Sequence, residues 1–183
     1  MRERKRQRLC GYDYSTPGGY FVTVCTHDRE CIFGAVENGN VKLNQYGEIV
    51  LECWYDLPNH YLHCRLDECI VMPNHFHGII MIDCMRIDNV GNGFKPFPTN
   101  KKDKLKQHCL SEIIRGFKTF SSRRINKTKP DTPFRWQKSY YDHIIRNEEE
   151  LNRIREYIIN NPQNWDTDRD MFVGNGFKCQ HDG

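Results

Sequence analysis

The amino-acid sequence predicts one mixed α/β domain in which strands and amphipathic helices share a single core. The chain has 183 residues, a length that suits one well-buried domain, and no break in composition divides it. Apolar residues make up 38% and charged residues 28%, an ordinary balance for a soluble protein. Segments with strand-like alternation and segments with helical spacing both occur, which favours a mixed fold. No apolar run is long enough to cross a bilayer, so we expect no membrane association.

The predicted domain spans residues 19–165, between a basic N-terminal arm at 1–18 and a C-terminal tail at 166–183. Residues 86–103 carry Gly, Asn, Pro and Lys without periodicity and are interpreted as a mobile insertion. The basic start lacks the apolar region of a secretion signal. The nine cysteines are scattered without a C-x-x-C pair, which favours free thiols over disulfides. We therefore expect a cytoplasmic protein.

A strand and a hairpin are the first elements predicted within the domain. Residues 20–26 are dense in aromatic and β-branched side chains, which is typical of a strand. A short apolar piece at residues 31–36 leads to an Asn-Gly-Asn turn at residues 38–40. Asn-Gly turns often join the two strands of a hairpin, so we expect the chain to pair with itself as far as Leu43.

A helix and two further strands are predicted next. Asn44 can cap a helix whose apolar residues recur at helical spacing through Leu57, and Pro58 is expected to stop it. The strands fall at about residues 66–72 and 75–83, on either side of a tight Pro-Asn turn. This short connection predicts a hairpin or a bulged continuation of one strand.

The second half of the domain is predicted to hold two helices around one strand. A helix at about residues 104–126 has an apolar stripe, with basic residues off that stripe facing solvent. A loop then feeds a strand that starts at about Tyr140. The last helix opens with Asn147 as its cap and Glu150 at the third helical position, as in a capping box. It is expected to end before Pro162.

Two histidines in the run VMPNHFHGII are the first candidates for a functional site. His75 and His77 are separated by one apolar residue in a strand-like segment, so alternation sends both rings to the same sheet face. Two ring nitrogens on one face would make a nearly preformed metal site. The alternative is that the two histidines line a half-polar surface.

One face of the last predicted helix carries a second candidate set. Arg153, Tyr157 and Asn161 are spaced i, i+4 and i+8, so a cation, a phenol and an amide project together. If this face meets the histidine pair, a metal, a nucleophile and a phosphate anchor converge. The alternative is a surface tyrosine near an asparagine at the end of a helix.

Three motifs in order resemble the single-tyrosine HUH transposases, in which HUH means histidine, hydrophobic residue, histidine. The motifs are MPNHFH from Met72, WQKSYYDHIIRN from Trp136 and YIINNP from Tyr157. Together they are most similar to the REP-associated tyrosine transposases, within the IS200-like transposases. The resemblance implies an α/β (α+β) ferredoxin-like fold with a central antiparallel β-sheet flanked by helices. It also implies a protein that cleaves and joins single-stranded hairpin DNA.

The same resemblance implies a role for each matching residue. His75 and His77 hold a divalent metal, Mg²⁺ or Mn²⁺, and Asn161 is the candidate third ligand. Tyr157 is the nucleophile and forms a 5′-phosphotyrosine intermediate. A second strand can then reverse the step, which explains strand transfer without a nucleotide cofactor.

Other residues of the second motif compete with these assignments. Tyr140 and Tyr141 are rival nucleophiles because an acid and a histidine follow them directly. The alternative, which we favour, is that they belong to a strand, with one tyrosine buried and one near DNA. His143 is a possible neighbour of the active site.

DNA binding is expected to combine basic side chains for phosphates with aromatic rings for unpaired bases. Trp136 lies in a loop suited to such stacking, although it could equally belong to the core. The predicted nucleic-acid-binding residues are Arg153, Trp136, Arg115, Lys118, Arg123 and Arg124.

Three functional hypotheses follow from these observations. The first is a metal-dependent single-stranded DNA endonuclease and strand transferase that acts at hairpin or palindromic DNA. The second is a domesticated hairpin DNA or RNA binding protein without cleavage activity. The third is a nickase of the replication-initiator or relaxase type, which usually arranges its motifs differently. The protein is expected to act as a monomer or a homodimer.

Overall fold

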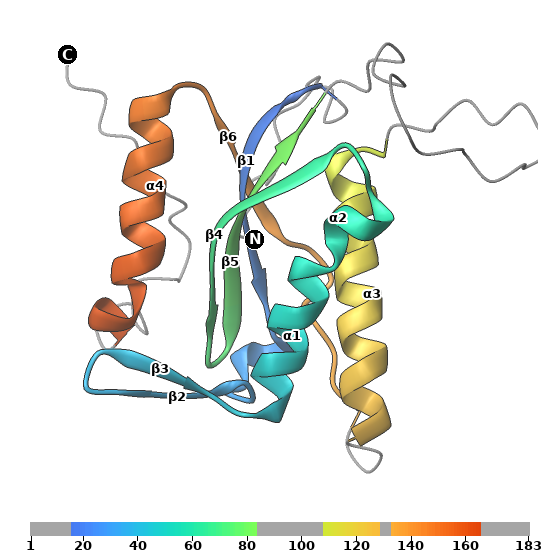
Figure 1. Ribbon diagram of the computed structural model, residues 1–183. Coiled ribbons are helices and arrows are strands. Elements are labelled where there is room, and N and C mark those ends of the chain that lie inside the picture. The colour runs from blue at the N-terminus through green and yellow to red at the C-terminus, as the bar shows by residue number, and fades with distance from the viewer. Residues whose placement is uncertain (1–15, 84–107, 129–132, 166–183) are drawn as a thin grey trace, which may run out of the picture.

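A four-stranded antiparallel sheet forms the centre of the computed structural model, which describes residues 16–83, 108–128 and 133–165 (Figure 1). The strand order is β4–β5–β1–β6. The strands are β1 (Gly18–Cys25), β4 (Cys64–Met72), β5 (His75–Ile82) and β6 (Tyr141–Ile145). One helical crossover joins β1 to β4 and another joins β5 to β6, which makes the topology ferredoxin-like. The predicted fold class is therefore confirmed.

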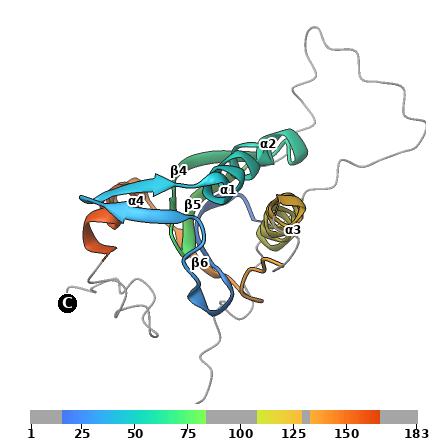
Figure 2. The same ribbon diagram turned by 90° about the horizontal axis from the view of Figure 1, so that it is seen from below.

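Helices cover both faces of this sheet (Figures 1 and 2). One face carries α1 (Gln45–Tyr55), α2 (Leu57–His60) and α3 (Leu110–Thr128). The other carries α4 (Glu148–Asn160), which continues into a 3₁₀ turn, η3 (Asn161–Asn164). Nearly all of the predicted N-terminal arm, the insertion at 86–103, the predicted helix start at 104 and the tail at 166–183 lie outside the described residues.

Strand alternation divides the buried side chains into two clusters. In β1, Tyr20 and Val22 join the large core against α1 and α3, whereas Phe21 joins a smaller cluster against α4. That smaller cluster also contains Ile79 of β5 and the apolar stripe of α4, formed by Leu151, Ile154 and Ile158. Burial of this stripe holds α4 against the sheet.

A glycine allows α1 to approach the sheet closely. At Gly78, an added Cβ would lie only 2.5 Å from Cζ2 of Trp54, whose ring is fully buried. Gly78 directly follows His77 in β5, so the His77 side chain points to the sheet face opposite the one that α1 covers. A larger residue at this position would displace the indole ring of Trp54.

The predicted hairpin is confirmed as β2 (Gly34–Glu37) and β3 (Asn40–Leu43). Asn38 and Gly39 have φ of 52° and 70°, as a two-residue turn of type I′ requires. This hairpin lies outside the main sheet, near η3 (Figure 1). A Cβ at Gly39 would lie 3.6 Å from Cγ of Gln163, so the hairpin tip supports the end of α4.

The helix capped by Asn44 ends earlier than predicted. Asn44 Oδ1 accepts hydrogen bonds from the backbone N of Tyr46 (2.9 Å) and Gly47 (3.2 Å), which confirms the cap. The helix ends at Tyr55, and Pro58 lies in the first turn of α2 instead of stopping α1. Proline is compatible with a first turn because its missing N–H has no helical partner there.

The cap of α4 is also as predicted, but the capping box is not. Asn147 Oδ1 accepts a hydrogen bond from the backbone N of Glu150 (2.8 Å). The carboxylate of Glu150 accepts from the backbone N of Arg146 (2.7 Å), one residue before the cap, and its other oxygen lies 2.7 Å from Nε2 of His143. The acid therefore ties the first turn of α4 to β6.

Candidate active site

The two histidines of β5 lie side by side on the face that α4 covers. His75 and His77 are 5% and 0% exposed, and their ring centroids lie 4.5 Å apart. The shared face predicted from alternation is confirmed. Their burial excludes the alternative in which they line a half-polar surface.

Hydrogen bonds hold each histidine through its Nδ1 atom. Nδ1 of His75 lies 2.7 Å from Oδ1 of Asn74, and Nδ1 of His77 lies 2.8 Å from Oγ1 of Thr23. A proton on Nδ1 that is donated to these oxygens leaves a lone pair on Nε2. Both Nε2 atoms are buried. The rings are therefore oriented as metal-ligating histidines are, with Nε2 as the nitrogen that can bind a cation.

The surroundings keep both imidazoles neutral. Burial lowers the pKa of His75 to about 3, the positive charge of Arg29 adds to this effect, and hydrogen bonding by Asn161 opposes it. Burial and the neighbouring His75 lower the pKa of His77 well below its usual value. Neutral rings keep the lone pairs that a metal ion needs.

The α4 helix brings Tyr157 to this pair. The Tyr157 ring is half-buried, and its centroid lies 5.4 Å from that of His77 and 6.0 Å from that of Phe21, edge-on to the latter. The prediction that the helix face meets the histidines is thus confirmed for the tyrosine. Arg153, one turn earlier on α4, is exposed.

Asn161 completes the group from the end of the same helix. It has helical backbone angles (φ −56°, ψ −40°), so the i+4 relation to Tyr157 continues although α4 ends at Asn160. The side chain is 1% exposed, and it acts on His75 by hydrogen bonding. The structure therefore places an amide beside the two imidazoles.

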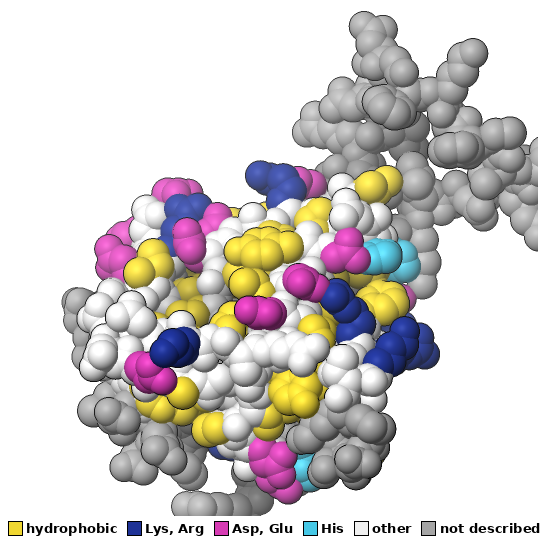
Figure 3. Space-filling view, turned by 60° about the horizontal axis from the view of Figure 1, so that its bottom comes forward, with side chains coloured by type: hydrophobic (Ala, Val, Ile, Leu, Met, Phe, Trp, Pro, Cys, Tyr) yellow, Lys and Arg dark blue, Asp and Glu magenta, His cyan; other side chains and the backbone are white. Residues whose placement is uncertain are grey.

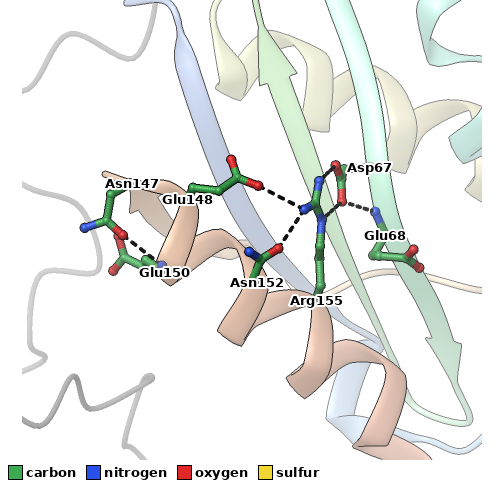
Figure 4. Close-up of polar contacts among 7 residues, drawn as sticks. All are labelled: Asp67, Glu68, Asn147, Glu148, Glu150, Asn152 and Arg155. Carbon is green, nitrogen blue, oxygen red and sulfur yellow. Dashed lines mark hydrogen bonds and ion pairs between the residues drawn. The ribbon is translucent and has the colours of Figure 1, made fainter.

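A bidentate ion pair fixes α4 to the edge strand of the sheet (Figure 4). Nε and Nη2 of Arg155 donate to the two carboxylate oxygens of Asp67 at 2.8 and 2.6 Å. Asp67 lies where β4 bulges, between Leu66 and Cys69. The guanidinium also contacts Asn152 and Glu148 of α4, and its hydrogen bonds lower the pKa of Asp67.

Of the two rival tyrosines, Tyr140 is buried, as favoured from the sequence, but it precedes strand β6, which begins at Tyr141. Tyr140 is 9% exposed and belongs to the large core, so it is not available as a nucleophile. Tyr141 lies opposite Thr23 and packs partly buried on the α4 face. His143 shares that face, but it lies opposite Phe21 and pairs with Glu150 at the first turn of α4.

Trp136 is a core residue, and the prediction that it stacks on DNA is wrong. It is 7% exposed, its ring packs at 5.1 Å from both Phe33 and Phe134, and its Nε1 donates to Ser121 Oγ at 3.0 Å. The structure agrees instead with the alternative kept open from the sequence, that Trp136 belongs to the core. An indole satisfied in this way presents no ring face to a base.

The basic residues of α3 lie on the opposite side of the sheet from the histidines (Figure 2). Lys118 is bound to the backbone oxygens of Gln137 and Lys138 at 2.6 and 3.1 Å, and Arg124 pairs with Glu52. On the face drawn in Figure 3, basic side chains are interspersed with acidic and hydrophobic ones. The predicted DNA-binding residues Arg115, Lys118, Arg123 and Arg124 therefore do not line the candidate site.

Four residues that sequence reasoning did not assign surround the site. Thr23 and Asn74 hold the histidine rings, the Trp165 ring stacks on His75, and Arg29 acts on His75 through its charge. Asn74 stands within the first motif and Thr23 within the first predicted strand, so pairing of the two strands could have found them. No local signal marks Arg29 or Trp165.

The donor set suits a divalent cation. It consists of two neutral imidazoles and one amide, and imidazole together with oxygen ligands accepts Mn²⁺ and similar ions. Among the described residues, no group of three His, Cys, Asp or Glu side chains is close enough to hold a metal. A metal at this site would therefore depend on the Asn161 amide or on water for its remaining ligands.

Comparison with known proteins agrees with this fold. The profile of the family described as "Transposase IS200 like" matches residues 104–161, a segment that includes Tyr157 and Asn161. An uncharacterised protein from Haemophilus influenzae is 36% identical over 171 residues, which cover 92% of this chain and 93% of that protein. A REP-associated tyrosine transposase, solved bound to a REP hairpin, superposes with a TM-score of 0.53 at 17% identity. The superposition covers 90% of this chain and 74% of that one.

The profile match assigns residues 104–161, and with them Tyr157, to a class of transposases, and in the structure the ring of this tyrosine lies against that of the buried His77. The described residues contain no helix that is both long and apolar enough to span a membrane. The chain belongs to the IS200-like transposase family, whose members are DNA-processing enzymes.

Proposed function

We propose that this transposase is a metal-dependent single-stranded DNA endonuclease and strand transferase. Tyr157 would be its nucleophile, and His75, His77 and Asn161 would hold the metal. The observation that carries the proposal is the contact between the Tyr157 and His77 rings, with centroids 5.4 Å apart. A structural tyrosine has no need of two buried, hydrogen-bonded imidazoles beside it. This juxtaposition of a phenol with candidate metal ligands supports phosphoryl transfer.

The proposed reaction uses the phenol oxygen of Tyr157 as the attacking group. A free tyrosine has a pKa of about 10, so the phenol must lose its proton as it attacks. The new bond joins the phenol oxygen to phosphorus, the bond from phosphorus to the 3′ oxygen breaks, and that oxygen gains a proton. The products are a 5′-phosphotyrosine link and a 3′ hydroxyl group. A 3′ hydroxyl from a second strand reverses the step, so no nucleotide cofactor is required.

The residues around Tyr157 orient the reacting groups. Thr23 and Asn74 fix the two imidazole rings, and the anchored α4 helix fixes the phenol relative to them. When bound by the histidines and Asn161, Mg²⁺ or Mn²⁺ would neutralise charge on the scissile phosphate. Hairpin DNA is the proposed substrate, since the REP-associated transposase of similar fold is bound to such a hairpin.

The proposal is tested by trapping the covalent intermediate. The wild-type protein, incubated with single-stranded hairpin DNA and Mn²⁺, is expected to form an adduct that migrates slowly on a denaturing gel. Tyr157→Phe should abolish the adduct because the attacking oxygen is gone. Tyr141→Phe is the matched control, since it removes a partly buried phenol from the same sheet face and should leave the adduct in place.

Two other results would contradict the proposal. Adduct formation that survives thorough chelation of divalent ions would remove the metal from the mechanism. A wild-type protein that binds hairpins tightly without forming an adduct on any of them would favour the second hypothesis, a binding protein without cleavage activity.

A further inference from the structure

Trp165 stands at the rim of the candidate site. Its ring stacks on His75, with centroids 6.1 Å apart and an interplanar angle of 26°. It follows directly after η3, so the turn that places Asn161 also places this indole. Trp165 is half-buried, whereas the other two tryptophans, Trp54 and Trp136, are 0% and 7% exposed. Trp165 is thus the tryptophan that solvent can reach.

A short turn brings a cation to the same rim. Thr26, the residue before η1 (His27–Arg29), donates through both its backbone N and its Oγ1 to the backbone oxygen of Asn74, at 3.0 Å each. The backbone N of Ile32 donates to the Pro73 oxygen at 2.9 Å. The η1 segment is therefore tied to the β4–β5 turn, whose Asn74 side chain also holds His75.

The backbone of η1 is strained where it carries the cation. Asp28 and Arg29 are exposed and have φ of 51° and 56°, the left-handed region that non-glycine residues seldom adopt. Strain of this kind persists only where surrounding contacts hold it, and it is frequent at ligand sites. Burial is the main cause of the low His75 pKa, and the charge of Arg29 adds to it, so the guanidinium lies within electrostatic reach of that ring.

We propose that Trp165 and Arg29 form a binding site for one unpaired nucleotide of the DNA strand, with its base on the indole and its phosphate on the guanidinium. This inference rests on the proposed function, which supplies a single-stranded substrate. Bases within a duplex are covered by their neighbours on both faces, so only an unpaired base can stack on an indole at the rim. Arginine suits the phosphate because its planar fork binds two oxygens at once.

The fluorescence of Trp165 tests the base contact without any chemistry. The protein is titrated with a short single-stranded oligonucleotide in EDTA, so neither metal binding nor cleavage contributes. Wild type should show saturable quenching, because a stacked base contacts the one indole that solvent reaches. Trp165→Phe should lose most of this quenching while it keeps the signal of the two buried tryptophans.

Affinity measured by anisotropy of a labelled oligonucleotide tests both contacts. Trp165→Ala is expected to bind about tenfold more weakly, and Trp165→Phe less weakly than that, since a smaller ring still stacks. Arg29→Gln should also bind several-fold more weakly. Arg65→Gln is the matched control, because Arg65 is also an exposed arginine but stands at the far end of β4 from the site. It should bind as wild type does.

Abasic oligonucleotides locate the nucleotide. Each position in turn is replaced by an abasic sugar, and one such replacement should weaken binding by the wild-type protein while it leaves binding by Trp165→Ala unaffected.

Wild-type affinity in Trp165→Ala, or equal losses of affinity in Arg29→Gln and Arg65→Gln, would overturn the inference. Circular dichroism confirms that each variant is folded. An adduct at Tyr157 combined with unchanged binding in these variants would refute this subsite alone and leave the proposed function standing.

Discussion

At the scale of single residues, the contacts of Thr23 and Asn74 matter because they decide which nitrogen each histidine presents. Both oxygens lie at Nδ1, so the ring orientation is set before any ion arrives. Neither Thr23 nor Asn74 would touch a bound ion directly. Their effect on the site is therefore measurable as a change in metal affinity.

We expect Thr23→Val to weaken Mn²⁺ binding by about tenfold to hundredfold, the range typical of lost outer contacts to metal-binding histidines. Valine keeps the shape of threonine but cannot form the hydrogen bond with Nδ1, so His77 loses its orientation. Isothermal titration calorimetry measures the affinity. Thr119→Val is the control, because the Thr119 hydroxyl donates to the Arg115 oxygen within α3, on the other side of the sheet, and its loss should not change the affinity.

Burial of two neutral histidines predicts that the metal-free protein loses stability in mild acid. The unfolded chain binds protons at these side chains below about pH 6.5, whereas the folded chain does not, since the His75 pKa is about 3. The free energy of unfolding therefore falls as pH falls below about 6.5. His75 alone should cost about 2 kcal/mol between pH 7 and pH 5.

Urea unfolding in EDTA at the two pH values measures this loss. The double variant His75→Gln/His77→Gln has no histidine to protonate at the site. Its free energy of unfolding should therefore fall clearly less between pH 7 and pH 5. Equal losses in the two proteins would show that other groups cause the acid sensitivity.

At the scale of elements, α4 is held at three points along its length. Asn147 caps its start, Glu150 ties its first turn to β6, and Arg155 ties its middle to β4. Tyr157 lies only two residues beyond Arg155 and therefore depends on this contact for its position. The residues that fix the helix are thus expected to affect the reaction without touching DNA.

The Arg155–Asp67 pair should contribute about 1 kcal/mol of coupling energy in a double-mutant cycle of Arg155→Gln and Asp67→Asn. Its side chains are 32% and 19% exposed, which limits screening by solvent. The Arg65–Asp83 pair is the control, since it has similar bidentate contacts at 2.6 and 3.0 Å but side chains 69% and 48% exposed. The coupling energy of the Arg65–Asp83 pair should be smaller. Substitutions that break the Arg155–Asp67 pair should slow adduct formation, whereas those that break the Arg65–Asp83 pair should not. Equal coupling in both cycles would contradict this reasoning.

At the scale of the whole molecule, the sheet separates two surfaces that the sequence could not tell apart. Arg153 lies on the helix of Tyr157, whereas Arg123 lies on α3 behind the sheet. Both are exposed. If Tyr157 is the nucleophile, as proposed, a DNA strand at the phenol would lie nearer to Arg153 than to Arg123, which is behind the sheet.

We therefore expect Arg153→Gln to lower the salt dependence of oligonucleotide binding, by about 0.7 in the slope of log affinity against log salt for one phosphate contact. Arg123→Gln should leave that slope unchanged. Anisotropy titrations from low to moderate salt measure both slopes. A larger effect from Arg123 would mean that DNA is bound across α3.

The parts of this site that could be predicted from the sequence are those set by local geometry. Alternation places His75 and His77 on the same face of a strand, and helical spacing places Tyr157 and Asn161 on the same face of a helix. Both relations hold whatever the rest of the chain does. Which tryptophan is buried could not be predicted in this way. Trp136 is removed from the surface by Phe33, Phe134 and Ser121, which come from other parts of the chain. Their contacts exist only after folding, as does the position of α3 relative to the sheet.

The strand order has a consequence for how the protein could be divided. Both histidines belong to residues 16–83, whereas the tyrosine and the asparagine belong to residues 108–165. The sheet joins the two segments through the pairing of β1 with β6. A chain cut between the segments would separate the candidate metal ligands of β5 from the nucleophile. Neither fragment alone would hold the site, and reassembly of the two could serve as a switch for DNA cleavage.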